Sequence, residues 1–455
     1  MRPVTLSTIA RWTAGRLIGA DVTVSAVSTD TRTMPPGALF VALHGDHFDA
    51  HAFLAAAEAA GAAAVLVSRP VETTLPQMHV ADTLDALGEL AAGLQHGRPA
   101  VTLALTGSNG KTSVKALLAA ILSRAGKTWV SPGNLNNEIG LPLAVIDAPE
   151  DAEFAVYEMG AGKPGDIAYL CSIVAPQVAL VNNVAPAHIE RLGSLAGIAE
   201  TKGAIYEALP DDGIAVVNAD DAFAPLFVQR IGGRRVLRYG LEQDADVRAR
   251  DVRLEADGSR FTLLTPAGRA DIALPLAGRH SVCNALAATA MALAAGAGFE
   301  AVVAGLHAVQ PVKGRQVAHA LAHGCVLIDD SYNANPGSVD AAIAALAAVP
   351  GDAWLVLGDM RELGPNAKAL HAAAGQQARA AGLKRLWTIG ELSAEASRTF
   401  GAEGRHFETQ RELISALAEA LSGAAGVRCL VKGSRGSAME NVVAGVTARE
   451  GSHAA

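Results

Sequence analysis

One turn of the sequence has the residue types that bind a nucleotide phosphate. The segment Thr106-Gly107-Ser108-Asn109-Gly110-Lys111-Thr112-Ser113 directly follows an apolar run at residues 101–105. Glycines let successive backbone N–H groups converge on a phosphate, and a helix that begins at this turn adds the positive end of its dipole. Lys111 would neutralise the β- and γ-phosphates, and the Thr112 hydroxyl would bind Mg²⁺. The turn therefore predicts ATP or GTP binding, but it does not name a reaction.

The glycine spacing of this turn differs from that of the usual P-loop. Only two residues separate Gly107 from Gly110, where four are usual, and Leu105 stands in the place of the usual first glycine. An alternative is a strand-to-helix turn with no chemical role. The pair Lys111-Thr112, directly after a glycine at the end of an apolar run, favours the phosphate site.

Two further apolar runs end in polar residues, as the run before the phosphate turn does. Residues 154–157 lead to Glu158, and residues 178–181 lead to the loop 182–188. Continuous apolar runs of this length are typical of parallel strands in a sheet that helices cover on both faces. Because ligands bind beyond the carboxyl ends of such strands, we expect Glu158 and the loop 182–188 to lie near Thr112.

The pattern of apolar runs divides the chain into three segments, which predict an α/β fold with three domains. Residues 1–98 alternate short apolar runs with an Ala-rich helical stretch and predict a small N-terminal α/β domain. Residues 99–312 predict a central, ATPase-like P-loop domain with a parallel sheet, and with short antiparallel strands between residues 246 and 275. Residues 313–455 predict a Rossmann-like, doubly wound domain. Because this last segment has no phosphate turn, we expect it to complete the site of the central domain.

Composition and charge argue against several classes of protein. Half of the residues are hydrophobic but only 4% are aromatic, which favours helices packed on sheets over a β-sandwich. The net charge of −8 argues against nucleic-acid binding, and four cysteines without a Cys-x-x-Cys pair argue against a zinc site or disulfide framework. Residues 1–17 lack the pattern of a signal peptide, and the weakly polar stretch 281–303 contains Asn284 and Glu300. We therefore expect a cytoplasmic protein that does not insert into membranes.

A series of short motifs, in this order, resembles the Mur ligases of peptidoglycan synthesis, and the resemblance covers nearly the whole chain. The motifs are Thr106 to Thr112, Gly133 to Pro142, Tyr157 to Gly160, Ala187-His188, Lys202-Gly203, Gly278 to His280, Lys313 to Arg315, Asp329 to Pro336 and Leu357 to Gly364. Each motif alone is weak, but their shared order makes coincidence improbable.

The resemblance implies an amide ligase that uses ATP. In this family ATP phosphorylates a substrate carboxylate, and the amine of the incoming residue attacks the acyl phosphate to give an amide, ADP and phosphate. The last two motifs resemble the branch that adds D-alanyl-D-alanine to UDP-N-acetylmuramoyl-tripeptide, which gives the pentapeptide precursor. The sister branch, which adds the third, diamino-acid residue, carries an Asp-Asn-Pro-Arg signature that this sequence lacks.

Three alternatives stay open at this point. Two are other ligases of the same superfamily, namely the diamino-acid-adding sister enzyme and a folylpolyglutamate synthetase-like protein. The third is a nucleotide-switched P-loop protein without ligase activity, which the accessory segments on both sides of the phosphate turn disfavour.

The resemblance implies a site for two Mg²⁺ ions and a modified lysine. Thr112, Glu158 and His188 would bind the metal ions. Lys202 matches a lysine that is typically carbamylated, and the carbamate would turn a cation into an anion that helps to bind the second Mg²⁺. From the residues alone, Lys202 would be a solvated lysine on a polar helix face, and His188 an ordinary loop histidine.

Further contacts with ATP and the substrates follow from the same resemblance. The ATP contacts would be Lys111 and Arg315 at the phosphates, Asn284 and Tyr332 at adenine, Asp330 at the ribose or a metal-bound water, and Asn333 in the same motif. The substrate contacts would be Thr29, Asp30, Arg32 and His51 for uridine, Asn134, Asn136 and Asn137 for sugar and peptide, and Asn335, Lys432 and Ser434 for D-alanyl-D-alanine. Helix capping for Asn284, core packing for Tyr332, solvated loop asparagines and a basic surface turn at Lys432 are the alternatives. We expect a monomer whose C-terminal domain closes on the phosphate turn.

Overall fold

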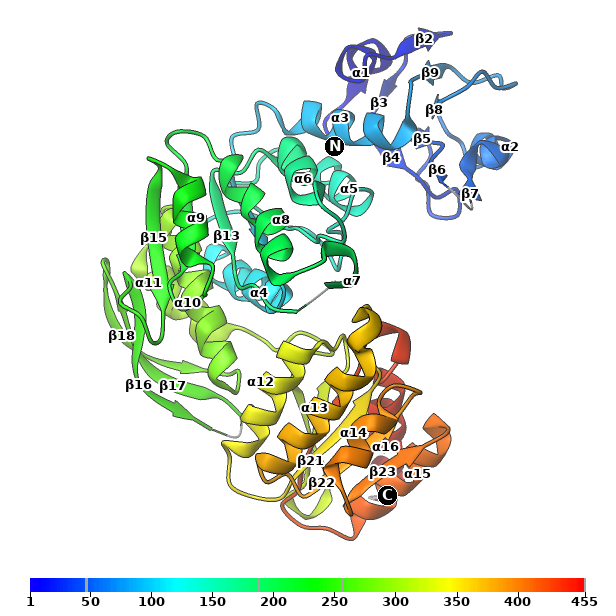
Figure 1. Cartoon of the computed structure of the whole chain (residues 1–455). Helices are drawn as coiled ribbons and strands as arrows, with labels where there is room; N and C mark the ends of the chain where they lie inside the picture. Colours follow the sequence, from blue (N-terminus) through cyan, green and yellow to red (C-terminus); the bar gives the residue numbers. More distant parts are fainter. Residues whose placement is uncertain (46–47, 187–188, 256, 454–455) are drawn as a thin grey trace.

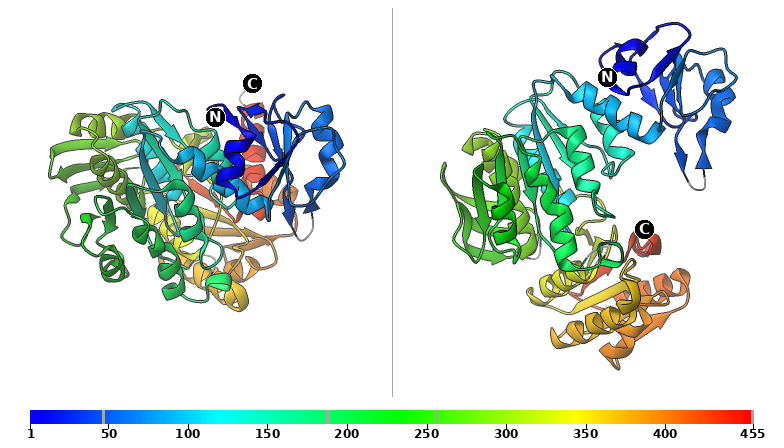
Figure 2. Two further views of the ribbon diagram at one scale, coloured as in Figure 1. Left: turned by 90° about the horizontal axis from the view of Figure 1, so that it is seen from above. Right: turned by 45° about the horizontal axis from the view of Figure 1, so that its top comes forward.

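The computed structural model of the chain describes residues 1–45, 48–186, 189–255 and 257–453. It has three α/β domains, each built on a sheet of its own (Figure 1). The predicted fold class is confirmed. The central domain lies between the other two, as the right-hand view of Figure 2 shows. Among the described residues, no helix is long and apolar enough to cross a membrane.

The N-terminal domain has a five-stranded sheet in the order β2-β9-β8-β5-β4, with two small antiparallel pairs beside it. The strands are β1 (Val4–Thr5), β2 (Arg16–Ile18), β3 (Thr23–Val24), β4 (Val27–Ser28), β5 (Leu39–Val41), β6 (His44–Gly45), β7 (Phe48–Asp49), β8 (Ala64–Val67) and β9 (Gln77–His79). The helices are α1 (Leu6–Trp12), the 3₁₀ turn η1 (Ala50–Phe53), α2 (Leu54–Ala59) and α3 (Thr83–Gln95). The Asp49 side chain caps η1 by accepting a hydrogen bond from the His51 amide, which starts the helical stretch expected there.

The central domain has a nine-stranded sheet in the order β11-β12-β10-β13-β14-β15-β16-β17-β18. Its strands are β10 (Val101–Thr106), β11 (Thr128–Val130), β12 (Phe154–Glu158), β13 (Val178–Val181), β14 (Ile214–Asn218), β15 (Arg235–Gly240), β16 (Val247–Leu254), β17 (Ser259–Thr265) and β18 (Gly268–Leu274). The strands from β11 to β16 pair in parallel, whereas β16, β17 and β18 pair antiparallel, as the short alternating runs predicted.

Helices cover both faces of the central sheet. They are α4 (Lys111–Leu122), α5 (Gly140–Ile146), α6 (Asp166–Val174), α7 (Ile189–Leu192), α8 (Leu195–Glu207), α9 (Ala224–Ile231), α10 (Arg279–Ala294) and α11 (Phe299–Ala308). Along β10, Leu103 and Leu105 pack with α4, α10 and α11, whereas Ala104 faces the core that contains α6 and α8. Burial on both faces explains why these strands have continuous apolar runs.

The C-terminal domain is doubly wound around a six-stranded sheet in the order β19-β20-β24-β21-β22-β23. The strands are β19 (Val317–Ala320), β20 (Val326–Asp330), β21 (Ala353–Gly358), β22 (Arg385–Ile389), β23 (Gly404–Phe407) and β24 (Arg428–Lys432), and only β19 is antiparallel to its neighbour. The helices α12 (Pro336–Ala347), α13 (Ala367–Ala380) and α14 (Ala394–Phe400) cover one face, and α15 (Gln410–Ser422) and α16 (Glu440–His453) cover the other. The 3₁₀ turns are η2 (Ala322–Gly324), η3 (Gly364–Asn366) and η4 (Arg435–Ser437).

Helix α3 is shared between the first two domains. Its buried residues belong to one apolar core with α1 of the N-terminal domain and with α5 and α6 of the central domain. A Cβ atom at Gly93 would overlap the Trp12 ring on one side, and a Cβ atom at Gly88 would overlap the Tyr169 hydroxyl on the other. The absence of side chains at both glycines therefore lets the two domains approach the same helix.

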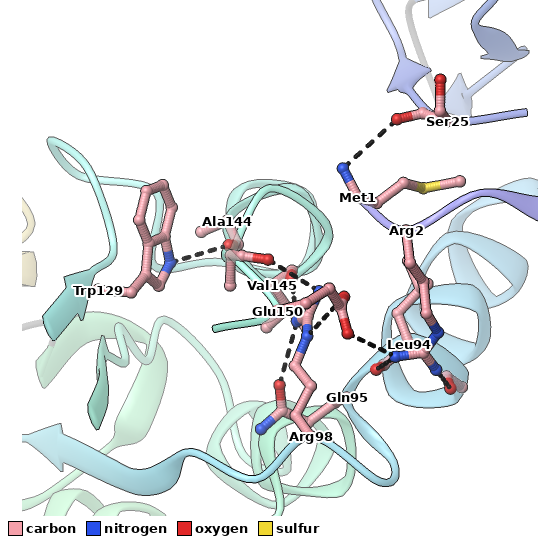
Figure 3. Close-up of polar contacts among 12 residues, drawn as sticks. Met1, Arg2, Ser25, Leu94, Gln95, Arg98, Trp129, Ala144, Val145 and Glu150 are labelled. Atoms are coloured by element: carbon pink, nitrogen blue, oxygen red, sulfur yellow. Dashed lines mark hydrogen bonds and ion pairs between the residues drawn. The ribbon is translucent and has the colours of Figure 1, made fainter. Parts of the chain in front are cut away.

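Two arginines and one carboxylate strengthen this junction (Figure 3). Glu150 accepts hydrogen bonds from Arg2 at 3.0 Å and from Arg98 at 2.9 Å, through different oxygens. Arg98, whose side chain is only 2% exposed, also donates to the carbonyl oxygen of Val145 in the last turn of α5 and to that of Ala148 just after the helix. A paired, buried guanidinium of this kind fixes the orientation of the segments that it joins.

Candidate functional site

A cavity of about 970 Å³ lies between the central and C-terminal domains. The phosphate turn and the loop after β11 line it from one side, and the segments before β19 and after β20 line it from the other. The predicted site residues that line it are Ser108, Asn109, Gly110, Lys111, Thr112, Ser113, Asn134, Asn136, Asn137, Glu158, Lys202, Asn284, Arg315, Asp330, Tyr332, Asn333, Asn335 and Lys432. Residues distant in the sequence therefore meet around one cavity.

The phosphate turn has the backbone that the sequence predicts. Strand β10 ends at Thr106 and helix α4 begins at Lys111. Gly110 has φ +78°, and a Cβ atom there would lie 2.5 Å from Asn284 Oδ1. Both the left-handed backbone and the close amide favour glycine at this position. The Thr106 side chain, in contrast, is fully buried and donates to the Met159 carbonyl at 2.9 Å, so its hydroxyl stabilises the strand end.

Two asparagines after β13 hold the phosphate turn in place. The amide nitrogens of Ser108 and Asn109 donate to the carbonyl and the side-chain oxygen of Asn183, at 2.9 and 2.8 Å. The Asn182 side chain donates to the Asn109 carbonyl at 3.0 Å and to Asn284 Oδ1 at 3.1 Å. Sequence reasoning placed this loop near Thr112 but missed the role of Asn182 and Asn183. Asn284 lies within α10, so it does not cap a helix.

Glu158 lies at the centre of a polar network. Its Oε2 accepts a hydrogen bond from the Thr112 hydroxyl at 3.0 Å, and its Oε1 accepts one from the Asn136 side chain at 3.0 Å. The Lys115 ammonium lies 3.3 Å from Oε2. Burial alone would raise the pKa of this carboxyl, but the charges of Lys111 and Lys115 and the hydrogen bonds outweigh it and lower the pKa. Glu158 is thus an ionised, almost fully buried carboxylate.

Sequence reasoning missed Lys115. It lies four residues after Lys111 on the same helix, a spacing that places both lysines on one face. That spacing was the available signal.

Two lysine side chains meet at the carbonyl oxygen of Gly107. Lys111 donates to it at 2.7 Å and Lys202 at 3.2 Å. Lys202 is only 1% exposed, so the alternative of a solvated surface lysine is wrong. Burial, with the Lys111 charge as a second cause, holds the pKa of Lys202 well below its ordinary value of 10.5. Lys202 is therefore a buried amine beside the phosphate turn whose protonation is disfavoured.

The residues that could bind metal ions are dispersed. Among the described residues, no group of three or more His, Cys, Asp or Glu side chains is close enough together to hold a metal ion. The Thr112 hydroxyl and the Glu158 carboxylate form a pair of oxygen ligands, which Mg²⁺ prefers. His188, the third predicted ligand, lies outside the described residues.

The C-terminal domain contacts the phosphate turn at two points. Arg315 Nη2 donates to the Thr112 hydroxyl at 3.0 Å, and the Asn335 side chain donates to Asn109 Oδ1 at 2.8 Å. The Arg315 guanidinium stacks 4.3 Å from the centre of the Tyr332 ring. Among the described residues, the buried Nε of Arg315 has no hydrogen-bond partner. Arg315 is also one of the residues that line the cavity.

Lys432 and Ser434 at the end of β24 are buried, so the alternative of a basic surface turn at Lys432 is wrong. The Lys432 ammonium donates to Asp330 Oδ2 at 2.6 Å and to the Asn333 carbonyl at 2.9 Å. The Ser434 hydroxyl donates to the Ala334 carbonyl and accepts from the Arg361 amide. Lys432 lines the cavity, whereas Ser434 supports the neighbouring loop.

The predicted uridine contacts lie in the N-terminal domain, apart from this cavity. Asp30 and Arg32 form an ion pair at the surface, and the hydrogen bond from Arg32 lowers the pKa of Asp30 to about 2. The His51 ring is buried: Nδ1 lies 2.6 Å from Asp49 Oδ1, and Nε2 accepts from the Ser68 amide at 3.1 Å. Its ring therefore organises the loop, while Thr29 is half-buried beside the ion pair.

Comparison with protein families assigns all three domains. Residues 23–95 match "Mur ligase family, catalytic domain", residues 105–292 match "Mur ligase middle domain", and residues 314–435 match "Mur ligase, glutamate ligase domain". The UDP-N-acetylmuramoyl-tripeptide–D-alanyl-D-alanine ligase of Escherichia coli K12 is 47% identical over 97% of this chain and 98% of its own length. The chain belongs to the Mur ligase family. The resemblance found in the motifs, and the enzyme class that it implied, are thereby confirmed.

Solved structures of Mur ligases share the whole fold. MurF from Acinetobacter baumannii superposes with a TM-score of 0.93 at 34% identity, covering 98% of this chain and 99% of that chain. MurF ligase from Thermotoga maritima, in complex with ADP, superposes with a TM-score of 0.85 at 27% identity, covering 94% and 98%. The arrangement of the three domains in this Mur ligase is thus that of MurF structures. Membership in a ligase family also disfavours the alternative of a nucleotide switch without ligase activity.

Proposed function

We propose that this Mur ligase adds D-alanyl-D-alanine to UDP-N-acetylmuramoyl-tripeptide, with conversion of ATP to ADP and phosphate. The observation that carries the proposal is that Arg315 lines the cavity and contacts Thr112 of the phosphate turn, while its buried Nε donor has no partner among the described residues. A buried guanidinium donor without a partner suits an anionic phosphate. The names of the similar enzymes supply the substrates.

The reaction would proceed in two displacements. A carboxylate oxygen of the tripeptide attacks the γ-phosphorus of ATP, the bond to the bridging oxygen breaks, and ADP leaves. The amino nitrogen of D-alanyl-D-alanine then attacks the acyl carbon, phosphate leaves, and the nitrogen loses a proton. Both steps depend on positioning and charge neutralisation more than on a covalent protein group. Lys111 and Arg315 would neutralise the phosphate charge, and the contact of the C-terminal domain with the turn would exclude water from the acyl phosphate.

Thr112 and Glu158 fit a Mg²⁺ ion. They present two oxygens 3.0 Å apart, and the remaining ligands would be phosphate oxygens and water, since the described residues hold no larger ligand cluster. Bound Mg²⁺ would neutralise charge on the phosphates. Asn284, Tyr332, Asp330 and Asn333 line the same cavity and are the proposed contacts for the nucleoside.

Lys202 fits a carbamate. A neutral amine reacts with CO₂, and burial keeps the Lys202 pKa low. The resulting anion would lie beside the Lys111 ammonium, since both side chains reach the Gly107 carbonyl. With His188, it would help to bind a second Mg²⁺.

The substrates would bind on both sides of the phosphate turn. Uridine would lie on the N-terminal domain, at the surface that contains Thr29, Asp30 and Arg32, with His51 holding the loop. The proposed contacts for the sugar and peptide are Asn134, Asn136 and Asn137. Those for D-alanyl-D-alanine are Asn335 and Lys432, with Ser434 holding the neighbouring loop. We also propose that the enzyme acts as a monomer in the cytoplasm.

Phosphate release from ATP tests the function directly. The assay contains Mg²⁺, UDP-N-acetylmuramoyl-tripeptide and D-alanyl-D-alanine, each omitted in turn, and mass spectrometry identifies the product. Release that needs both substrates, with a pentapeptide product, supports the proposal. Release with a free diamino acid and the dipeptide precursor would instead assign the chain to the sister branch, and release without any acceptor would contradict a ligase.

A further inference from the structure

Lys115 is a buried lysine that does not belong to the residues lining the cavity between the domains. Its side chain is 7% exposed, and its ammonium donates to the carbonyl oxygens of Ser131 at 3.0 Å and Gly133 at 2.8 Å. Glu158 Oε2 forms an ion pair with the same ammonium, at 3.3 Å. An ammonium has three N–H donors, of which the two carbonyls use two, and the carboxylate supplies the opposite charge beside it. Lys115 is therefore built to contact protein groups and not a phosphate.

The partners of Lys115 belong to two different parts of the site. Glu158 ends β12 and shares its Oε2 with the Thr112 hydroxyl. Ser131 and Gly133 begin the loop after β11 that carries Asn136. Asn136 in turn donates to Glu158 Oε1, so the loop and the carboxylate are joined on both sides. A second hydrogen bond, from the Gly160 amide to the Asn136 carbonyl at 2.7 Å, also links this loop to the segment after β12.

The charge of Lys115 and its place on α4 hold one side of this network of contacts in position. Thr112 and Lys115 are three residues apart on α4, so one helix face presents both groups to the same carboxylate oxygen. A buried carboxylate that loses its cation is strongly disfavoured, and a loop that loses its tie gains conformational freedom. Removal of the Lys115 charge would thus disturb Glu158 and the loop together.

We propose that Lys115 is a positioning residue that couples the Glu158 carboxylate to the loop 131–137, so that Mg²⁺ binding and binding of the UDP-linked substrate depend on one another. The inference rests on the proposed function, because it takes Glu158 as a metal ligand and the loop asparagines as substrate contacts. Outer contacts that orient metal ligands commonly affect metal affinity or activity by about 10- to 100-fold.

The test compares Lys115→Met, which keeps the length of the side chain without its charge, with Lys127→Met. Lys127 is an exposed lysine of the same domain whose ammonium pairs with Asp151 at the surface, away from the cavity. Calorimetry measures ADP binding with and without Mg²⁺, and thermal unfolding reports whether each variant is folded. Steady-state assays give the Mg²⁺ concentration for half-maximal activity and the KM of each substrate.

For Lys115→Met we expect a rise of about tenfold or more in the Mg²⁺ requirement and loss of the Mg²⁺-dependent gain in ADP affinity, with ADP binding in the absence of Mg²⁺ unchanged. The KM for UDP-N-acetylmuramoyl-tripeptide rises with it, whereas the KM for D-alanyl-D-alanine does not. Lys127→Met behaves as the wild type. Lys115→Arg, which retains the charge, is the second variant and keeps a Mg²⁺ requirement closer to that of the wild type.

Wild-type Mg²⁺ dependence and tripeptide KM in a folded Lys115→Met variant would overturn the inference, as would an equal change in the KM of both substrates. If Lys115→Met does not fold, the same comparison is made with Lys115→Arg and Asn136→Ala. Equal metal requirements in these two variants would then contradict the coupling. The Mg²⁺-dependent binding of ADP needs no acceptor, so a failure of the proposed reaction in the wild type is distinguished from a failure of the coupling.

Discussion

The guanidinium of Arg315 donates a hydrogen bond to the Thr112 hydroxyl at 3.0 Å, across 203 positions of the sequence and between two domains. One group of the C-terminal domain therefore touches the first turn of α4, where the phosphate turn ends. The stacked Tyr332 ring holds the guanidinium from the side of its own domain. The C-terminal domain therefore contacts directly the residue proposed to bind Mg²⁺, so a movement of this domain would change that contact.

Arg315→Ala is expected to lower kcat by about 10²- to 10³-fold, because a preorganised donor at the phosphates is lost. Steady-state phosphate release with both substrates measures the effect. Arg398→Ala is the control, since Arg398 is exposed and pairs with Glu395 in the same helix. A variant with wild-type kcat would show that Arg315 does not act on the phosphates.

Lys202→Ala is expected to abolish turnover, and short carboxylic acids are expected to restore part of it. The acid would take the place of the carbamate next to Lys111. Turnover is measured with and without acetate or propionate, and a titration gives the concentration for half-maximal rescue. Unchanged activity in the variant would remove the carbamate hypothesis.

The stability of the CO₂-free protein should depend on Lys202 at alkaline pH. Its pKa is lowered by burial in the folded chain and is near 10.5 in the unfolded chain, so the unfolded chain binds more protons between the two values. The free energy of unfolding contributed by Lys202 therefore rises with pH in this window and falls as pH decreases through it. Urea unfolding between about pH 8 and 10 should show a smaller rise for Lys202→Met than for the wild type. Equal slopes would show that the buried amine does not titrate as the geometry implies.

Gly305→Ala is expected to lower the free energy of unfolding by about 1–3 kcal/mol. A Cβ atom at Gly305 of α11 would lie 2.5 Å from the Cα of Ile121 in α4, and backbone atoms cannot rotate away. Gly298→Ala is the matched control, because Gly298 precedes the same helix and a Cβ atom there meets nothing within 4 Å. Urea unfolding of the two variants measures the difference, and equal stability would mean that α11 shifts without cost.

The sequence predicted the strands and the phosphate turn because their signals are local. The run 101–105 is apolar on both faces of its strand, and the Gly-Lys-Thr turn follows at once. The burial of Lys202 was not predictable in this way, because α8 buries Thr201, Lys202 and Gly203 together and shows no clean polar face. The role of Lys115 depends on Ser131, Gly133 and Glu158, which only the folded sheet brings to it.

The same limit applies to the N-terminal domain. His51 was expected to contact uridine, but its ring nitrogens are occupied by Asp49 and Ser68, and Ser68 is 17 positions away. We therefore assign to His51 the role of supporting the loop and not that of a direct substrate contact. The surface ion pair of Asp30 and Arg32, in contrast, involves residues two positions apart and could be foreseen from the sequence.

The shared helix α3 limits how this enzyme can be rebuilt from parts. A chimaera joined at residue 98 would take α3 with the N-terminal domain, yet Gly88 of that helix is shaped to the Tyr169 hydroxyl of the central domain. A donor with any larger residue at position 88 would collide across the new joint, and a donor without Arg2 would leave Glu150 with Arg98 alone. When substrate-binding domains are exchanged between relatives, the residues on both sides of this joint therefore have to be transferred together.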